Sequence, residues 1–420
     1  MKKSISLFIL SVVLFSCTTE NELVYQELST AVPELNKRSL TEALGIAQEA
    51  ASLFNGKSRN VESRTIDMGN IQYLCSNPNS RSQNDDTLLY VINYADDKGF
   101  AVVSANPNTV GLIALTEKGT YSPTSEEISN NGGMKMYMDM AKMYVSDPNN
   151  ELQRSGPVTM LEIFEKEDTV DTWIEPKLTV SWGQTWHEGD YCPNGVSGCT
   201  NTALAQIMTY FEYPTQIDIT YEDAEINTLN LNWSEIKKYK SRYNDTASNI
   251  AHSAVSHLLR QLGKLTKTKY NHSPNTTSTA TVEARTAMSS LGYTVSSSVQ
   301  NYENENFLPA LQNNNLVYMR GERSTEDGTV GHAWVIDGIF ERMLHYMAYT
   351  REPNSELWTL HDESYAYYRY NHINWGWDGL CNGYFLEDVF KPGYAVHYDG
   401  TSYLYNYNYN LSLMYFLITK

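Results

Sequence analysis

The sequence is short of cysteine, of positive charge and of long apolar runs, and each shortage excludes a class of protein. Lysine and arginine total 31 against 49 aspartates and glutamates, so the 420-residue chain carries a net charge of -18. This negative charge, without any stripe of basic and aromatic residues, argues against a nucleic-acid partner. The five cysteines show no Cys-x-x-Cys pair and no zinc-ligand spacing, and we expect neither a metal nor a cofactor.

The one extended apolar stretch lies at the N-terminus, where Lys2 and Lys3 precede residues 5–15. The stretch is too short to span a bilayer and is typical of an export signal. It ends in Leu-Phe-Ser-Cys at Cys17, which resembles a bacterial lipoprotein signal: residues 1–16 would be removed and Cys17 would carry a lipid. We therefore expect an exported bacterial protein, anchored to a membrane in the periplasm or at the cell surface, whose mature domain is released. Secretion with an unmodified Cys17 is the alternative.

The segment that most clearly indicates a catalytic function begins at Gly198-Cys199. Apolar residues recur at three- and four-residue steps after the cysteine, which predicts a helix as far as about Phe211. The thiolate is the nucleophilic form of cysteine, and a free thiol has a pKa near ~8.5. The positive end of a helix dipole and a neighbouring imidazolium would both favour the thiolate at Cys199.

Three further residues could complete a site for acyl transfer. His332 follows Cys199 by 133 residues, within the roughly 130–150 that separate cysteine and histidine in papain-like peptidases. Asn374 would accept a hydrogen bond from the second ring nitrogen and orient the imidazole, and Trp375 would shield that bond from water. The Gln184 side chain and the backbone N–H of Cys199 are candidate donors to the oxyanion.

Each of these residues, taken singly, is more often structural than catalytic, and only their order and spacing together favour catalysis. His372 is an alternative imidazole, because it lies two residues before Asn374 and shares its strand face. We favour His332, since the small residues Gly331 and Ala333 flank it in a strand-like run.

These segments together resemble the streptopain-like cysteine peptidase family. The matching motifs are Gly198-Cys199 with Ala205-Gln206-Ile207-Met208, His332-Ala333-Trp334-Val335-Ile336-Asp337-Gly338, Asn374-Trp375-Gly376-Trp377, and Trp182-Gly183-Gln184. The resemblance covers roughly residues 60–395. It implies an α+β fold, in which a two-lobed papain-like catalytic domain, with a helical lobe and an antiparallel β lobe, follows an α+β prodomain. It also implies a secreted zymogen, endopeptidase activity on proteins or peptides, and a prodomain that acts as an intramolecular inhibitor.

The domain boundaries follow from the resemblance and from the turn formers near residue 150. We expect a tether and inhibitory prodomain over residues 17–153 and a peptidase domain over residues 154–420. An exposed cleavage site is expected at Gln153 or Arg154, with Lys166 as a second possibility. A surface loop that is never cut is the alternative.

Periodicity and turn residues predict the main elements of both domains. The expected helices cover residues 39–54, 134–145, 249–262, closed by Gly263, and 282–291, closed by Gly292. The expected strands cover residues 87–94, 99–103, 110–115, 316–320, 333–340, 384–385 and 403–418.

Two features depart from the family pattern. Thr200-Asn201 stands where small apolar residues are usual, and an aromatic- and charge-rich region from Glu341 to Tyr370 is longer than the resemblance implies. We expect this insertion to form a loop or hairpin near the cleft, so substrate preference cannot be carried over. Two other functions stay open: a transglutaminase-like acyl transferase with the same triad, and a catalytically silent papain-fold protein that binds or inhibits.

Overall fold

The computed structural model describes most of the chain between residues 37 and 420. The described ranges are 37–55, 64–76, 87–122, 131–147, 161–272, 275–302, 306–325, 328–351, 357–390 and 412–420. The predictions made for residues 1–16, for Cys17 and for cleavage at Gln153 or Arg154 fall outside these ranges. Within them, no helix is both long and apolar enough to cross a membrane.

The chain divides into two compact units, which are described separately. The larger unit comprises residues 33–155, 169–343 and 367–420, and the smaller one comprises residues 1–32, 156–168 and 344–366. All the candidate catalytic residues belong to the larger unit.

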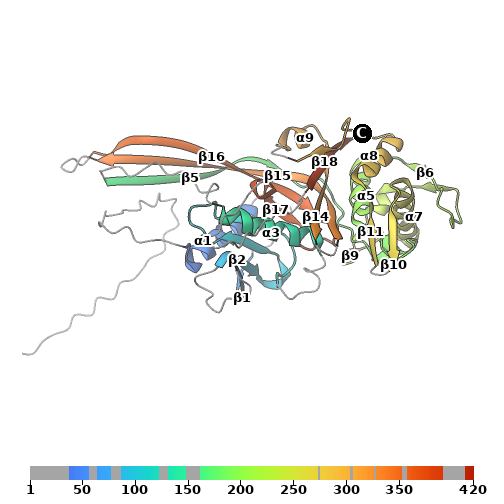
Figure 1. The fold of residues 1–420 in the computed structure, drawn as a ribbon, viewed down its shortest axis with the longest axis horizontal. Coiled ribbons are helices and arrows are strands. Elements are labelled where there is room, and N and C mark those ends of the chain that lie inside the picture. The colour runs from blue at the N-terminus through green and yellow to red at the C-terminus, as the bar shows by residue number, and fades with distance from the viewer. Residues whose placement is uncertain are drawn as a thin grey trace, which may run out of the picture. The chain divides into compact units, whose positions relative to one another are not determined.

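In the described residues of its N-terminal part, the larger unit consists of antiparallel strands with helices α1 and α3 (Figure 1). The elements are α1 (Leu40–Asn55), β1 (Ile66–Cys75), β2 (Thr87–Tyr94), β3 (Phe100–Ser104), β4 (Leu112–Thr116) and α3 (Gly132–Ser146). Strands β2, β3 and β4 are almost wholly buried, in keeping with their apolar sequences. Ser39 and Glu42 cap α1 reciprocally, since the Glu42 N–H donates to Ser39 Oγ and the Ser39 N–H donates to Glu42 Oε2.

A helical region follows in the chain. Its helices are α4 (Trp186–Gly189), α5 (Cys199–Phe211), α6 (Trp233–Ile236), α7 (Asn249–Leu265), α8 (Thr281–Ser290) and α9 (Leu308–Gln312). Helix α7 contacts α4, α5, α6 and α8. Three small hairpins join these helices: β6 (Gln216–Asp218) with β7 (Thr228–Asn230), β8 (Tyr239–Ser241) with β9 (Asn244–Asp245), and β10 (Lys269–His272) with β11 (Asn275–Ser278).

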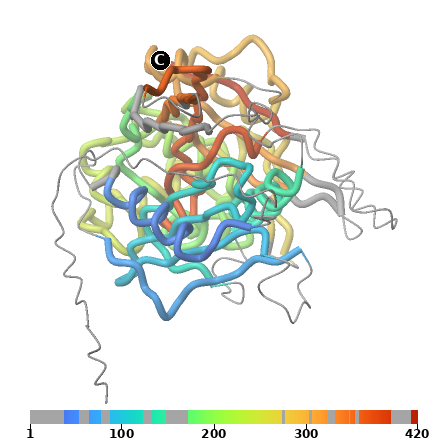
Figure 2. The backbone as a smooth tube through the Cα atoms, turned by 90° about the vertical axis from the view of Figure 1, so that its left-hand side faces the viewer, coloured from blue at the N-terminus to red at the C-terminus, as the bar shows by residue number. Residues whose placement is uncertain are grey.

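The remaining strands continue the N-terminal sheet. They are β5 (Leu161–Ile174), β12 (Thr294–Val295), β13 (Gln300–Asn301), β14 (Leu316–Thr325), β15 (Gly328–Arg351), β16 (Thr359–Asn374), β17 (Gly383–Leu386) and β18 (Ser412–Thr419). The order along the sheet is β1-β2-β3-β4-β17-β16-β15-β14-β18-β12, with β13 on β18 and β5 on β15. Strand β4 pairs with β17, so the N-terminal strands and those of the β lobe form one antiparallel sheet. In Figure 2 the blue and cyan N-terminal segments gather in the lower part of the view.

Most of the expected elements are confirmed, with two corrections. Strand β1 was not expected, because its sequence is polar and carries no clear alternation. Helix α7 does not end at Gly263 but continues to Leu265, and Gly263 instead makes room for the hydroxyl of Tyr270, with which an added Cβ would collide. Lys166 lies inside strand β5, and cleavage at this residue stays a prediction.

The region from Glu341 to Tyr370 supplies parts of strands β15 and β16, which are neighbours in the sheet. The expectation of a hairpin there is therefore confirmed, and its position near the cleft stays a prediction.

Candidate active site

Cys199 is the first residue of helix α5, as the sequence predicts. Gly198 is the N-cap residue and has φ = 89°, a conformation that favours glycine. A Cβ on Gly198 would also collide with the side chain of Thr277. The glycine therefore permits both the backbone turn and the close approach that place Cys199 at the helix N-terminus, where the dipole favours an anion.

Thr200 and Asn201, which depart from the family pattern, are buried and hydrogen-bonded. The Thr200 hydroxyl lies 3.0 Å from the hydroxyl of Tyr318. The Asn201 amide donates to the Ser197 carbonyl at 2.8 Å, and its oxygen accepts from Thr266 Oγ1 at 2.9 Å. Because every polar group named here has a partner, the two residues replace apolar packing with a satisfied network.

His332 lies in strand β15, opposite Gly321 of β14, and is buried. Its Nε2 lies 2.8 Å from the backbone oxygen of Trp375. A carbonyl oxygen only accepts hydrogen bonds, so Nε2 must carry the proton and the neutral ring keeps Nδ1 as its acceptor. This tautomer leaves Nδ1 available to the thiol of Cys199.

Burial and His332 have opposite effects on the pKa of Cys199. Burial of the sulfur disfavours the thiolate, but the hydrogen bond and charge of His332, the charge of Arg320 and the N–H of Ala333 together lower the pKa of Cys199 to about 7. A thiol with this pKa is about half ionised at neutral pH, which is a property of nucleophilic cysteines. Cys192, in contrast, is buried, and that burial raises its pKa to about 11.

The acceptor for the imidazole N–H was expected to be the Asn374 side chain and is instead the backbone oxygen of Trp375. The Asn374 amide donates to the Val180 carbonyl at 3.0 Å, and its oxygen accepts from the Gly376 N–H at 3.1 Å. These two bonds hold the turn that presents the Trp375 carbonyl to His332. Asn374 is thus placed as a residue that positions the acceptor, and the Trp375 ring is buried 6.2 Å from the imidazole, centroid to centroid.

His372, the alternative imidazole, is engaged by carboxylates. Its Nδ1 lies 2.6 Å from Asp337 Oδ1 and its Nε2 lies 3.6 Å from Glu117 Oε2. Burial lowers the pKa of His372, but the two carboxylates outweigh burial and raise that pKa to about 10. A histidine held as a cation at neutral pH cannot act as the general base, so the geometry favours His332.

The backbone of Gln184 is hydrogen-bonded to the segment that precedes Cys199. Its carbonyl oxygen accepts from the Ser197 N–H at 2.8 Å and from the Ser197 hydroxyl at 3.2 Å. This link fixes Gln184 beside the start of α5, and its role as an oxyanion donor stays a prediction.

The sequence reasoning missed a contact between helix α3 and the imidazole. A Cβ on Gly133 would lie 2.5 Å from His332 Cδ2 and would collide with the ring of Trp375. One turn later, Met136 packs against Gly321, the residue paired with His332. The N-terminal turn of α3 therefore packs directly on His332, and the Gly-Gly pair at the start of the helix was the available signal.

Comparisons with known proteins match two families to two parts of the chain. Residues 182–385 match the Peptidase C10 family, and residues 36–145 match the Spi protease inhibitor family. The chain is 24% identical to streptopain of Streptococcus pyogenes over 402 residues, which cover 85% of each protein. It is also 24% identical to the thiol protease/hemagglutinin PrtT of Porphyromonas gingivalis, over 74% of this chain and 35% of that protein.

Among solved structures, a fragment of prointerpain A from Prevotella intermedia aligns with a TM-score of 0.48 and 16% identity, over 84% of this chain and 98% of the fragment. The two family matches confirm the expected resemblance and the α+β papain-like fold with an N-terminal inhibitor-like domain.

Proposed function

We propose that residues 182–385, which match the Peptidase C10 family, form a cysteine peptidase domain, and that the protein is a latent endopeptidase whose N-terminal domain blocks its own site. One observation carries the proposal: Gly133 packs on the same imidazole that lowers the pKa of Cys199. The substrates are proteins or peptides.

The proposed reaction is hydrolysis of a peptide bond through an acyl-enzyme. His332 takes the proton of the Cys199 thiol at Nδ1, and the sulfur attacks the carbonyl carbon. The Cys199 N–H and the Gln184 side chain stabilise the oxyanion, and losing one such donor typically raises the barrier by about 2.7–4 kcal/mol. His332 then protonates the leaving amine, and water cleaves the thioester, which regenerates the thiol.

The Trp375 carbonyl has a fixed role in each step of this mechanism. By accepting from Nε2, it holds the imidazole in one tautomer and orientation, and it stabilises the imidazolium that forms when the thiol ionises. The two hydrogen bonds of Asn374 keep that carbonyl in place. Asn374 is accordingly proposed as a positioning residue.

Two contacts support inhibition by the N-terminal domain. The first turn of α3 packs on His332, where a substrate would need access. Strand β4 pairs with β17 through Thr116 and Gly383, so the N-terminal domain also adds strands to the sheet of the peptidase domain. The match of residues 36–145 to protease inhibitors agrees with this role.

The proposal is tested by intact mass spectrometry of the purified full chain over time, with Cys199→Ala beside the parent. We expect the parent alone to lose the segment up to about Gln153 and to cleave a protein substrate, because the variant has no nucleophile. Cys192→Ala is the matched control, since Cys192 is buried and plays no part in the mechanism. An active Cys199→Ala protein would refute the proposal.

Two further measurements separate the alternatives. If the parent does not trim itself, limited trypsin treatment followed by a substrate assay distinguishes activation by another protease from a silent site. If the acyl group passes to an added amine rather than to water, the reaction is a transglutaminase-like transfer.

We also propose, from the sequence alone, that the precursor is exported and carries a lipid on Cys17. In a bacterial host, Cys17→Ser should shift the protein from the membrane fraction to the soluble fraction. An unchanged distribution would favour secretion without a lipid.

A further inference from the structure

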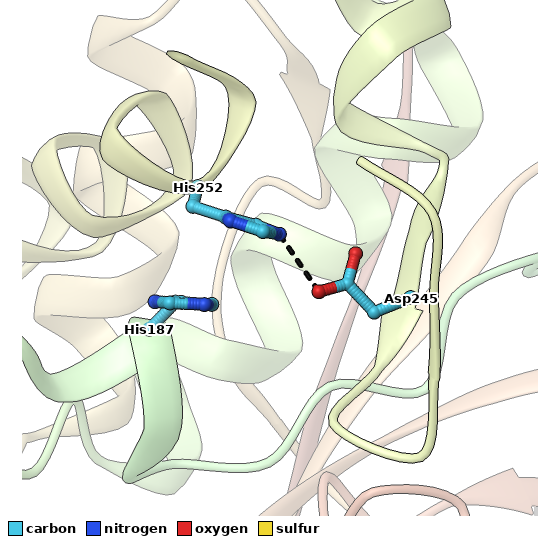
Figure 3. A group of neighbouring side chains, drawn as sticks. All are labelled: His187, Asp245 and His252. Carbon is cyan, nitrogen blue, oxygen red and sulfur yellow. Dashed lines mark ion pairs between the residues drawn. The ribbon is translucent and has the colours of Figure 1, made fainter. Parts of the chain in front are cut away.

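Outside the proposed active site, three side chains from three separate elements point toward one another (Figure 3). His187 comes from α4, Asp245 from β9 and His252 from the first turn of α7. Each residue offers one nitrogen or oxygen atom, and these three atoms all lie within 4.8 Å of one another. The sequence spacing of the three residues matches no metal motif, which is why the cluster was not expected.

The two imidazoles lie next to the same carboxylate, that of Asp245. His252 Nε2 lies 2.8 Å from Asp245 Oδ2, and the two imidazole rings are stacked with centroids 4.0 Å apart and planes 15° apart. Parallel rings at this distance bring a nitrogen of each toward the same carboxylate, as Figure 3 shows. Two nitrogens and one oxygen that converge in this way form a set of candidate metal ligands.

The carboxylate and one imidazole are oriented by further hydrogen bonds. The Ala247 N–H donates to Asp245 Oδ1 at 2.9 Å, which leaves Oδ2 facing the imidazoles. His187 Nδ1 lies 3.1 Å from Asp190 Oδ2, which leaves its Nε2 free for an ion. A carboxylate on the outer nitrogen of a ligating histidine is the usual second-shell arrangement of metal sites.

The two helices that carry the histidines are joined next to the cluster. The Ser256 hydroxyl lies 2.6 Å from the His187 carbonyl and 2.9 Å from the His252 carbonyl. The edge of the Tyr239 ring packs against both imidazoles. The ligand atoms are thus held by the fold, and their positions do not depend on a bound ion.

The charge and exposure of the cluster suit a cation that enters from solvent. The cluster contains one acidic side chain, Asp245, which offers an oxygen ligand beside the two imidazole nitrogens. The side chains of His187, Asp245 and His252 are 27%, 24% and 13% exposed. An ion could reach them, and water could fill the remaining coordination positions.

We propose that His187, Asp245 and His252 bind a zinc-like divalent cation, with Asp190 as the outer partner of His187. Imidazole ligands favour zinc, cobalt and nickel, whereas calcium and magnesium require oxygen ligands. Helix α4 begins two residues after Gln184, the candidate oxyanion donor. An ion bound to His187 and His252 would therefore hold the segment next to Gln184 against α7. The ion is a structural clamp and takes no part in the proposed hydrolysis.

The test is calorimetric titration of the metal-stripped full chain with Zn²⁺, in a Cys199→Ala background that prevents self-cleavage and binding at the nucleophile. We expect one tight equivalent and no heat with Mg²⁺. Asp245→Asn, His252→Gln and His187→Gln should each weaken binding by about tenfold or more, since even outer-shell losses cost 10–100-fold. His345→Gln is the matched control, because His345 also pairs with a carboxylate, Glu363 at 2.7 Å, but is not part of the cluster.

Two further measurements test the proposed metal site independently of the calorimetric titration. Zn²⁺ should raise the melting temperature of the parent but not that of Asp245→Asn, an isosteric change whose melting temperature in EDTA should equal that of the parent. Co²⁺ should give the absorption of a nitrogen and oxygen site without a thiolate charge-transfer band. The proposal is overturned by the absence of Zn²⁺ binding, by binding that Asp245→Asn and His252→Gln leave unchanged, or by a thiolate band.

Discussion

The ionisation of Cys199 depends on a few groups that contact it, and His332 leads those that favour the thiolate. The imidazole is in turn held by the backbone oxygen of Trp375 rather than by the side chain of Asn374. A backbone acceptor is not removed by a side-chain mutation. Substitution of Asn374 should therefore disturb the orientation of His332 less than it would if the Asn374 side chain were itself the acceptor.

We expect alkylation of Cys199 by iodoacetamide to rise through a midpoint near pH 7. The pKa is lowered below the ordinary value, so the reactive thiolate is present above pH 7 and lost below it. In His332→Gln the midpoint should move up toward that of an ordinary thiol. Quantification of the modified peptide against pH measures both midpoints, and an unchanged midpoint in His332→Gln would contradict this account. Cys192 serves as the unreactive internal control, because burial raises its pKa to about 11.

Gly133→Ala should weaken the hold of the N-terminal domain on the site. The added Cβ would collide with Trp375 and lie 2.5 Å from His332 Cδ2, whereas a Cβ on Gly132 would lie 3.9 Å from its nearest neighbour, His332 Cβ. Overpacking of this kind costs about 1–3 kcal/mol, which is about 5–150-fold in affinity. The measurement is inhibition of the mature peptidase by the separately added N-terminal domain. Gly132→Ala is the control, and equal inhibition by both variants would argue against the contact.

At the scale of elements, the pairing of β4 with β17 joins two domains that match two different families. A strand pair of this kind adds backbone hydrogen bonds to the packing of α3 on His332. It also means that removal of the N-terminal domain turns β17 into an edge strand with unpaired backbone groups.

We therefore expect the amides of β17, residues Gly383–Leu386, to exchange faster with solvent deuterium after maturation. Strand β4 protects them in the precursor through its pairs with Gly383, Tyr384 and Phe385. Hydrogen exchange with mass spectrometry on the precursor and the mature form would measure the change. Strands β14 and β15 pair with each other away from β4 and should keep their protection. Equal exchange of β17 in both forms would show that this pairing contributes no protection.

At the scale of the whole molecule, His372 lies between carboxylates that belong to the two different domains. His372 and Asp337 belong to the peptidase domain, and Glu117, which approaches His372 at 3.6 Å, belongs to the N-terminal domain. Asp337 is fully buried, and its second oxygen accepts from the Leu178 N–H at 2.8 Å. Removing the imidazole would leave a buried carboxylate without its counter-ion, which typically costs about 3–5 kcal/mol.

His372→Gln should therefore destabilise the precursor most at low pH. The folded-state pKa of His372 is raised from 6.5 to about 10, so its stabilisation is complete below pH 6.5 and is lost as the pH rises toward 10. The difference in unfolding free energy between parent and variant should fall by up to ~1.4 kcal/mol per pH unit across that window. Urea unfolding at several pH values, in the Cys199→Ala background, measures it. His345→Gln is the control, and a pH-independent difference between parent and His372→Gln would refute the linkage.

The sequence alone determined the elements whose signals are local. The helix at Cys199 follows from apolar residues at helical steps, and strand β2 over Thr87–Tyr94 follows from a β-rich apolar run. The same local rules failed for β1, whose polar sequence carries little alternation, and for the end of α7, where the packing of Tyr270 requires Gly263. Tertiary contacts override local preference in both places.

The order and spacing of Cys199, His332 and the Asn374 segment were enough to predict the peptidase family, since chain order persists when most side chains have changed. Only the tertiary structure decided which atom faces the imidazole, that α3 packs on it, and that His187, Asp245 and His252 converge. Periodicity describes neighbours a few residues apart. Contacts between distant segments depend on how the elements pack, and no local pattern in the chain specifies them.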